Sequence, residues 1–362
     1  VGVVGESGCD KSVTSMSVMR LIQGPSGQIA EGSIRFKSLD YKRDEKGNPI
    51  PVYEKDENGE VIYEEVYDKK GNLKLDKEGN PVKAPKQLVG PNGVGVYEME
   101  ETVFDLAKIP IAEMYRLRGR QMAMVFQEPM TSLNPIFTIG DQLDEVTYIH
   151  NPEATAEQAQ ARSLEMLRLV GIAAPERVYN SYPHELSGGM RQRVMIAMAL
   201  ACKPKILIAD EPTTALDVTI QAQILELMKA LQKENGTAIL FITHDLGVIN
   251  EMADEVAVMY CGQVVERVPA PLLFGDCRYM HPYTEGLLIS APSEKNAGNR
   301  LRSIPGSVPS PYAIPKGCRF APRCPYATEK CIREMPILKG VGEGQEIRCF
   351  YPSLKERRSE EH

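Results

Sequence analysis

Two adjacent carboxylates, Asp210 and Glu211, follow a short apolar run and have the chemistry needed at a phosphate. The run, Ile206–Ala209, is typical of a strand buried on both faces of a parallel sheet. Mg²⁺ prefers oxygen ligands and attack of water on a phosphate needs a base, so one carboxylate can hold the metal while the other activates water. By itself the pair is weak support for a site, because two acids at a strand end are more often simply solvated.

A glycine-rich helix start lies about twenty residues before this strand. Leu186–Met190 contains two adjacent glycines, and Ser187 is a good N-cap for a helix that runs to Cys202. The free N–H groups of a first helical turn suit an anion such as phosphate. Pro204 cannot continue the helix, so the pattern predicts a glycine-rich turn, a helix and then the buried strand.

A second phosphate-binding pattern begins the chain. Val1–Val4 resembles a strand, and the residues after it fit the loop form G-x-x-x-x-G-K-[ST] at Gly5, Lys11 and Ser12. In such a loop backbone N–H groups wrap the phosphates, the lysine reaches the outer phosphates and the hydroxyl binds Mg²⁺. Asp10 stands where the pattern has its second glycine, so the loop is altered.

The order of these motifs resembles the nucleotide-binding subunits of ABC transporters. Leu186–Met190 is similar to their signature motif, Ile206–Glu211 to their Walker B strand and Thr214–Asp217 to their D-loop. The loop Gly5–Ser12 is similar to their Walker A loop. The resemblance implies an α/β fold, in which a P-loop NTPase core carries a small antiparallel β part, a helical subdomain and a Cys-rich C-terminal extension.

The resemblance also implies a role for each motif residue. Glu211 would be the general base, while Gln127 and His244 would contact the γ-phosphate and order the attacking water. ATP would be bound by Gly5, Ser7, Gly8, Lys11, Ser12 and Val13. Mg²⁺ would be held by Ser12, Gln127 and Asp210. The signature residues Leu186, Ser187, Gly188, Gly189 and Met190, with the D-loop residue Asp217, would act at a site shared with a partner subunit.

By this resemblance, residues 1–265 form an ABC-type nucleotide-binding domain, with the helical subdomain and its signature motif at about 140–200. Residues 266–362 form the extension. Family members carry antiparallel strands before the Walker A loop, including an aromatic residue that stacks on adenine. No such strands precede Val1, so we expect the sequence to be truncated at its N-terminus.

Residues 40–86 are poorly covered by the resemblance. Glycines at positions 47, 59, 71 and 79 lie in turn-forming contexts between short runs that contain Val, Ile and Tyr. This pattern predicts an inserted β-hairpin arm, and a partly ordered charged loop is an equal alternative.

Segments near the C-terminus narrow the resemblance to ATPases of oligopeptide and dipeptide importers. These segments are His281–Leu288 and Ile304–Pro309, and Gln127–Pro135 also matches that branch. Four cysteines follow with five, six and seventeen residues between them, and they include no C-x₂₋₄-C pair of the kind found in zinc sites. Thiolates in an irregular segment can instead ligate iron and sulfur. In this branch the corresponding cysteines, Cys318, Cys324, Cys331 and Cys349, are similar to those that bind a [4Fe–4S] cluster; the alternative is four unligated thiols.

Composition agrees with this class of protein. The 362 residues carry a net charge of −7, so no global basic field favours nucleic acid. No apolar run approaches the ~20 residues needed to span a bilayer. Eight cysteines without an export signal predict a cytosolic chain, where disulfides are rare.

The implied function is ATP hydrolysis that powers peptide import from the cytoplasmic face of the membrane, where the chain would be peripheral. Two such subunits, identical or different, would enclose two ATP molecules beneath two transmembrane permease subunits, with an extracellular substrate-binding protein as an indirect partner. The cargo would be a dipeptide, an oligopeptide or a nickel chelate.

One alternative is an ABC ATPase without a transporter, although the chain lacks the long coiled coils or second cassette of such proteins.

A second alternative is a structural subunit whose own site fails while its signature motif serves a partner. Asp10 motivates it, because a carboxylate about 4 Å from a phosphate charge opposes binding by about 4 kcal/mol at an effective dielectric near 20. A helix N-terminus offers only ~0.3–2 kcal/mol of attraction. The sequence therefore predicts weak ATP binding, and at least about tenfold tighter binding after Asp10→Gly.

Overall fold

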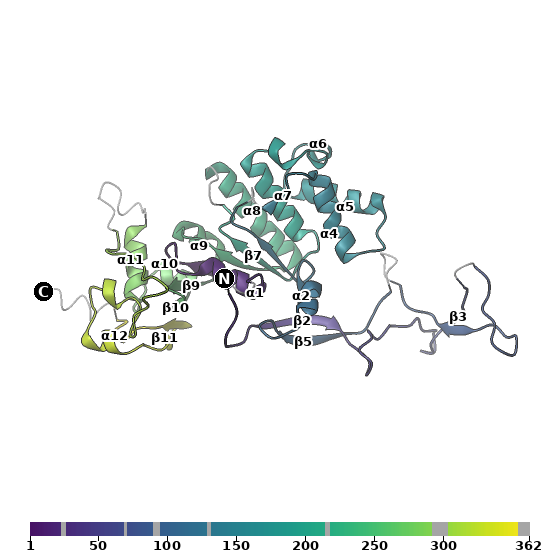
Figure 1. Ribbon diagram of the computed structural model, residues 1–362, viewed down its shortest axis with the longest axis horizontal. Helices are drawn as coiled ribbons and strands as arrows, with labels where there is room; N and C mark the ends of the chain where they lie inside the picture. Colours follow the sequence, from purple (N-terminus) through teal and green to yellow (C-terminus); the bar gives the residue numbers. More distant parts are fainter. Residues whose placement is uncertain are drawn as a thin grey trace. The chain divides into compact units, whose positions relative to one another are not determined.

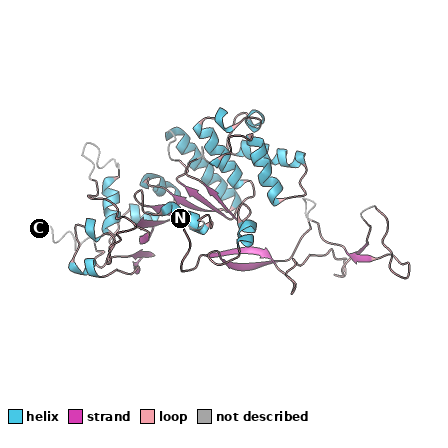
Figure 2. Cartoon of the chain, in the orientation of Figure 1, coloured by secondary structure: helices cyan, strands magenta, loops and turns pink. Residues whose placement is uncertain are grey.

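The computed structural model describes residues 1–22, 27–68, 71–89, 95–128, 132–213, 218–291 and 303–353. They form two compact units, the first made of Val1–Glu31 with Pro110–His362 and the second of Gly32–Ile109. Figure 1 labels many of the elements of both units, and Figure 2 distinguishes their helices from their strands.

The first unit is built around an eight-stranded sheet with the order β11-β12-β10-β9-β1-β8-β7-β6. Its parallel strands are β1 (Gly2–Val4), β6 (Met122–Val125), β7 (Ile206–Asp210), β8 (Ala238–Ile242) and β9 (Glu255–Tyr260). Its antiparallel strands are β10 (Gln263–Pro269), β11 (Lys339–Gly342) and β12 (Gln345–Ile347). The apolar runs predicted at Val1–Val4 and Ile206–Ala209 are confirmed as strands β1 and β7, and β1 and β6 are buried along their whole length.

Helices of the first unit precede or follow these strands. They are α1 (Lys11–Val18), α2 (Ile111–Leu117), α4 (Ile139–His150), α5 (Ala156–Leu169), α6 (Pro175–Tyr179), α7 (Gly188–Leu200), α8 (Val218–Asn235), α9 (Leu246–Met252), α10 (Ala270–Phe274), α11 (Pro282–Ser290) and α12 (Glu329–Arg333). Single 3₁₀ turns occur at η1 (Pro183–Glu185) and η3 (Ala321–Arg323). Within the described parts of the chain, no helix is both long and apolar enough to cross a membrane.

The pattern Thr155-x-x-Gln158 predicts the start of a helix and Gly171 predicts its end, and both are confirmed in α5. The Thr155 hydroxyl accepts from the Gln158 backbone while the Gln158 side chain accepts from the Thr155 backbone, which is a capping box. Gly171 ends the helix with φ +74°. A second capping box joins Thr138 and Asp141 at the start of α4.

After the phosphate-binding loop the sequence predicts a helix over Val13–Ile22, whereas α1 starts at Lys11 and stops at Val18. Arg20 has φ +51° and its N–H donates to Ser17 O, which closes the helix early. The glycine and proline expected to end this helix, residues 24 and 25, lie outside the described residues.

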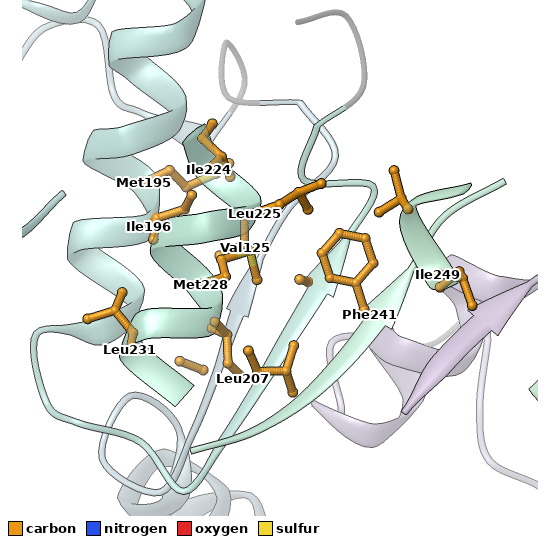
Figure 3. Close-up of a cluster of buried hydrophobic side chains, with 14 of the residues drawn as sticks. Val125, Met195, Ile196, Leu207, Ile224, Leu225, Met228, Leu231, Phe241 and Ile249 are labelled. Carbon is orange, nitrogen blue, oxygen red and sulfur yellow. The ribbon is translucent and has the colours of Figure 1, made fainter. Parts of the chain in front are cut away.

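The hydrophobic core lies between the sheet and the long helices. Figure 3 shows side chains of α7 and α8 facing those of β6, β7 and β8. The residues drawn there include Val125, Met195, Ile196, Leu207, Ile224, Leu225, Met228, Leu231 and Phe241. Fully burying one such side chain contributes roughly 1.5–3 kcal/mol, so this layer holds the strand ends in register.

The C-terminal extension continues the main sheet. Strand β12 pairs with β10 through Glu266 and Ile347, so residues on both sides of position 265 share one sheet and one compact unit. Glu266 is fully buried, and its carboxylate accepts hydrogen bonds from His281 N at 2.8 Å and Gln345 Nε2 at 2.7 Å. The extension is therefore joined to the rest of the first unit by strand pairing and by the contacts of Glu266.

The second unit contains the antiparallel pair β2 (Arg35–Tyr41) and β5 (Met99–Asp105), with a short hairpin of β3 (Tyr63–Glu65) and β4 (Lys83–Pro85). The four predicted glycine turns are present with φ between +83° and +88°. Four aspartates stabilise these turns, each accepting the backbone N–H four residues later: Asp44, Asp56, Asp68 and Asp76. Backbone pairing runs from Lys42 to Glu98, so the arm extends beyond the 40–86 range that the sequence predicts.

We expect Phe241→Ala to lower the free energy of unfolding by about 3–5 kcal/mol. Phe241 of β8 is 2% exposed, so the change leaves a cavity in the core beside this strand. Thermal unfolding followed by circular dichroism measures the effect. Val218→Ala, at a side chain that is 84% exposed, is the control and should shift stability by no more than ~0.5 kcal/mol. Equal midpoints for the two variants would contradict the assignment of Phe241 to the core.

Candidate active site

Four loops meet at the carboxyl edge of the parallel strands, where open α/β sheets bind their ligands. They follow β1, β6, β7 and β8, and they surround a cleft of about 830 Å³. Five residues predicted from sequence line it: Ser7, Gly8, Gln127, Glu211 and His244. Glu6 and residues 308–311 also line the cleft, and the sequence did not indicate them.

The loop between β1 and α1 carries the residues of the predicted phosphate-binding pattern. Lys11, 6% exposed, donates from Nζ to Gly5 O at 2.8 Å and to Glu6 O at 3.1 Å. A β-carbon on Gly5 would collide with the carbonyl oxygen of Met259, so only glycine fits there. Val13 is exposed on the first turn of α1.

Asp10 adopts the left-handed conformation that glycine favours, with φ +69° and ψ +26°. Aspartate tolerates this region better than most residues, so the loop keeps its shape despite the substitution. A β-carbon added to Gly262 would lie 3.2 Å from Asp10 Oδ2 and 3.3 Å from Arg319 Nη1, so both charged groups approach the same glycine. Asp10 is not one of the described residues that line the cleft.

The buried carboxylate of Asp210 lies beside two hydroxyl groups of α1. Ser12 Oγ donates to Asp210 Oδ1 at 3.1 Å, and Ser15 Oγ donates to Asp210 Oδ2 at 3.3 Å. Burial raises the pKa of Asp210, and the hydrogen bonds from the two serines oppose that rise. The Ser12 hydroxyl and the Asp210 carboxylate are the oxygen donors that Mg²⁺ prefers.

Glu211 is held between two residues from neighbouring loops. Gln127 Nε2 donates to Glu211 Oε2 at 3.0 Å, and His244 Nδ1 lies 3.5 Å from Glu211 Oε1. Glu211 has φ +47°, and its N–H donates to Ile242 O at 2.9 Å. The strained backbone turns this carboxylate into the cleft while Asp210 stays buried.

The glycine-rich segment Leu186–Met190 forms the start of α7, as the sequence predicts. Ser187 is the N-cap and accepts from Met190 N at 3.4 Å. Leu186 is buried, while a β-carbon on Gly188 would meet no neighbouring atom. None of the described residues lining the cleft belongs to this segment. The D-loop residue Asp217 lies outside the described residues.

The four C-terminal cysteines line a single small cavity. Cys318, Cys324, Cys331 and Cys349 share it with aromatic and proline side chains. Burial raises the pKa of Cys324 to about 12, and the neighbouring thiols add to that rise. Across the described residues, no three His, Cys, Asp or Glu side chains lie close enough together to hold one metal ion.

Comparison with families of known proteins gives two matches along the chain. Residues 60–214 match the family model described as ABC transporter. Residues 265–331 match the model described as the oligopeptide/dipeptide transporter C-terminal region. The second match covers the segment that brings Tyr283 and Arg323 to the phosphate-binding loop.

Whole-chain relatives agree with both matches. The oligopeptide transport ATP-binding protein AppD of Bacillus subtilis is 44% identical over 97% of this chain and 86% of its own length. The dipeptide transport ATP-binding protein DppD of Escherichia coli is 41% identical over 97% of this chain and 86% of its own length. A solved ATP-binding cassette, described as a dimer in a post-hydrolysis state with ADP and Pi, is 30% identical over 47% of this chain and 74% of its own, with a TM-score of 0.43. The chain belongs to the family of ABC-transporter ATP-binding subunits with an oligopeptide/dipeptide-type C-terminal region.

Proposed function

We propose that this chain hydrolyses ATP in the cleft at the carboxyl edge of the sheet, and that hydrolysis drives peptide import. The observation that carries the proposal is the convergence of Ser7, Gly8, Gln127, Glu211 and His244 around one cleft. The names of the relatives, which are oligopeptide and dipeptide transport proteins, support the cargo class.

The proposed roles follow from the contacts. Ser12, Asp210 and Gln127 would hold Mg²⁺, which neutralises charge on the phosphate oxygens. Lys11 would exchange its bonds to Gly5 O and Glu6 O for phosphate oxygens. Backbone N–H groups of the loop and of the first turn of α1 would complete the phosphate site.

Glu211 is the proposed general base. Its carboxylate faces the cleft and is oriented by Gln127 and His244, so it can accept a proton from water as the water attacks the γ-phosphate. Asp210 is buried against Ser12 and Ser15. Its proposed role is therefore to bind Mg²⁺ and not to accept a proton from water.

A partner subunit would complete each ATP site. Ser187, Gly188 and Gly189 present an N-cap and two glycines at the start of α7, which suits binding of a phosphate. Because this segment is not in the cleft of its own chain, we propose that it acts on ATP bound by a second, identical or different, ATPase subunit.

As a member of this family, the chain works as a peripheral subunit at the cytoplasmic face of the membrane, with transmembrane permease subunits. We propose that a permease helix docks in the groove of about 540 Å³ beside α4, which Phe137, Asp141 and Met198 help to line. An extracellular substrate-binding protein would deliver the peptide to the permease.

We expect Glu211→Gln to lower steady-state ATP hydrolysis by about 10²-fold or more while nucleotide binding stays largely intact, because the amide keeps the shape and loses the base. Phosphate release by the reconstituted transporter measures the rate, and titration calorimetry measures binding. Glu226→Gln, an exposed change on α8, is the control. Hydrolysis at the rate of the unchanged chain would remove Glu211 as the base.

We also propose that the four cysteines bind a [4Fe–4S] cluster. Their presence around one cavity, with apolar and aromatic neighbours, fits the thiolate donors of such a cluster. The sulfurs need not approach as closely as ligands of one ion, because each thiolate binds a different iron. Bound, the cluster would supply cross-links between Cys318, Cys324, Cys331 and Cys349 that hold the extension together.

Protein purified without oxygen should be brown and contain about four irons per chain. Cys324→Ser should lose the colour and the iron, while Cys202→Ser, at a cysteine that does not line the cavity, should keep both. Metal analysis and visible absorption measure the outcome. Stoichiometric zinc without iron would favour a zinc site, and neither metal would favour four free thiols.

Asp10 distinguishes an active subunit from one that only completes a partner's site. Its carboxylate approaches Gly262 on the side where Arg319 also lies, and that cation offsets part of the repulsion of a phosphate. This arrangement supports an active site with a modest loss of affinity, smaller than the sequence alone predicts.

We therefore expect Asp10→Gly to tighten ATP binding by less than about tenfold. Titration calorimetry with Mg²⁺ present measures both dissociation constants. Asp10→Asn, which keeps the shape without the charge, should fall between the two forms. Tightening by tenfold or more would instead support the structural, catalytically impaired subunit.

A further inference from the structure

Glu6 of the phosphate-binding loop forms an ion pair with the C-terminal extension. Its carboxylate accepts two hydrogen bonds from one guanidinium, from Arg323 Nη1 to Oε2 at 2.7 Å and from Arg323 Nη2 to Oε1 at 3.0 Å. The two residues are 317 positions apart in the chain. Such two-pronged contacts fix orientation as well as charge, which a lysine cannot do.

Arg323 is held by the extension as well as by Glu6. Its side chain is 3% exposed, Nε donates to Pro305 O at 2.8 Å and Nη2 reaches Ile304 O at 3.3 Å. Nη1 lies 3.4 Å from Tyr260 Oη. A guanidinium stays protonated in proteins, so this side chain is charged. The cation is therefore fixed beside the loop.

The extension also holds the backbone of the same loop residue. Glu6 N donates to Tyr283 Oη at 2.7 Å, and Tyr283 is fully buried. The Tyr283 ring packs against Tyr260 at 4.6 Å and Phe320 at 5.4 Å between centroids. Both the backbone and the carboxylate of Glu6 are thus bound by side chains of the extension, an aromatic one and a cationic one.

Glu6 lines the same cleft as Ser7 and Gly8, next to the positions that bind phosphate. ATP brings several negative charges to that edge, and an uncompensated carboxylate there would repel them. The repulsion is strong in a partly desolvated cleft, because it is screened less than on an open surface.

We propose that Arg323 is a positioning residue for ATP binding, and that its guanidinium neutralises Glu6 so that the loop accepts the polyphosphate. The C-terminal extension is then a working part of the nucleotide site. This inference rests on ATP binding at the cleft, which titration of the unchanged chain tests separately. Failure of the unchanged chain to bind ATP would contradict the proposed function, whereas unaltered binding by the variants below would contradict this inference alone.

The first test is Arg323→Gln in the assembled transporter, compared with the unchanged chain. The dissociation constant for Mg·ATP should rise about tenfold, which corresponds to ~1.4 kcal/mol, because Glu6 is left charged without its partner. The KM for ATP should rise with it while kcat changes by less than about twofold, since the hydrolytic residues are not touched. Arg333→Gln removes an exposed ion pair with Glu329 in the same extension and is the matched control.

A second substitution, at Glu6, distinguishes neutralisation of the Glu6 charge from general structural support by Arg323. Glu6→Gln with Arg323→Gln removes the unpaired carboxylate, so its dissociation constant should return to within about threefold of the unchanged chain. If Arg323 only supported the fold, the double variant would bind Mg·ATP as weakly as Arg323→Gln does. Both variants lose the hydrogen bonds from the Arg323 guanidinium to Pro305 O and Ile304 O.

Arg323→Lys keeps the charge without the two-pronged contact, and it tests the proposal even if the glutamine variant fails to fold. Its dissociation constant should stay within about threefold of the unchanged chain. The proposal is overturned by a tenfold loss in the lysine variant, by no loss in Arg323→Gln, or by absence of rescue in the double variant.

Discussion

The parallel register of β1, β7 and β8 is the constraint on which the site depends. Val3 pairs with Ile242, and Ile242 pairs with Asp210, so three loops leave the sheet at the same edge. A slip by one residue would turn the side chains of a strand to the opposite face. The Asp210 carboxylate would then lose its hydrogen bonds from the Ser12 and Ser15 hydroxyl groups. The layer of α7 and α8 on the sheet prevents such a slip, because the slip would expose the buried apolar side chains of these strands.

Charged groups in the site are buried only where they meet partners. Lys11 donates to two carbonyl groups, Asp210 accepts from two hydroxyl groups, and Arg323 meets Glu6 and two carbonyl groups. An unpaired buried charge costs several kcal/mol, so these contacts offset the cost of burial and hold the groups in position before a ligand binds. In the proposed site, ATP would exchange these existing polar contacts for contacts to phosphate.

The two units show different relations between sequence and structure. In the second unit each turn is specified within five residues, since an aspartate side chain binds the backbone four residues later and a glycine adopts positive φ. Strands, capping boxes and the glycine-rich start of α7 in the first unit are also local patterns, and the sequence predicts them. Helix and arm limits are less predictable: α1 ends early at Arg20, and the arm pairs as far as Glu98.

The amino-acid sequence by itself determined the pattern of the phosphate-binding loop and the two carboxylates after β7, because each is a short pattern next to a strand. Gln127 and His244 were indicated only by the resemblance to a family, because a single polar residue after a strand has no pattern of its own. It also indicated four cysteines but not their common cavity. Only the tertiary structure joined Arg323 to Glu6, turned Asp10 toward the glycine that Arg319 also approaches, and added β12 to the edge of the sheet. These contacts join residues that are far apart in the chain, and they depend on how the extension packs against β9 and β10, which no local pattern records.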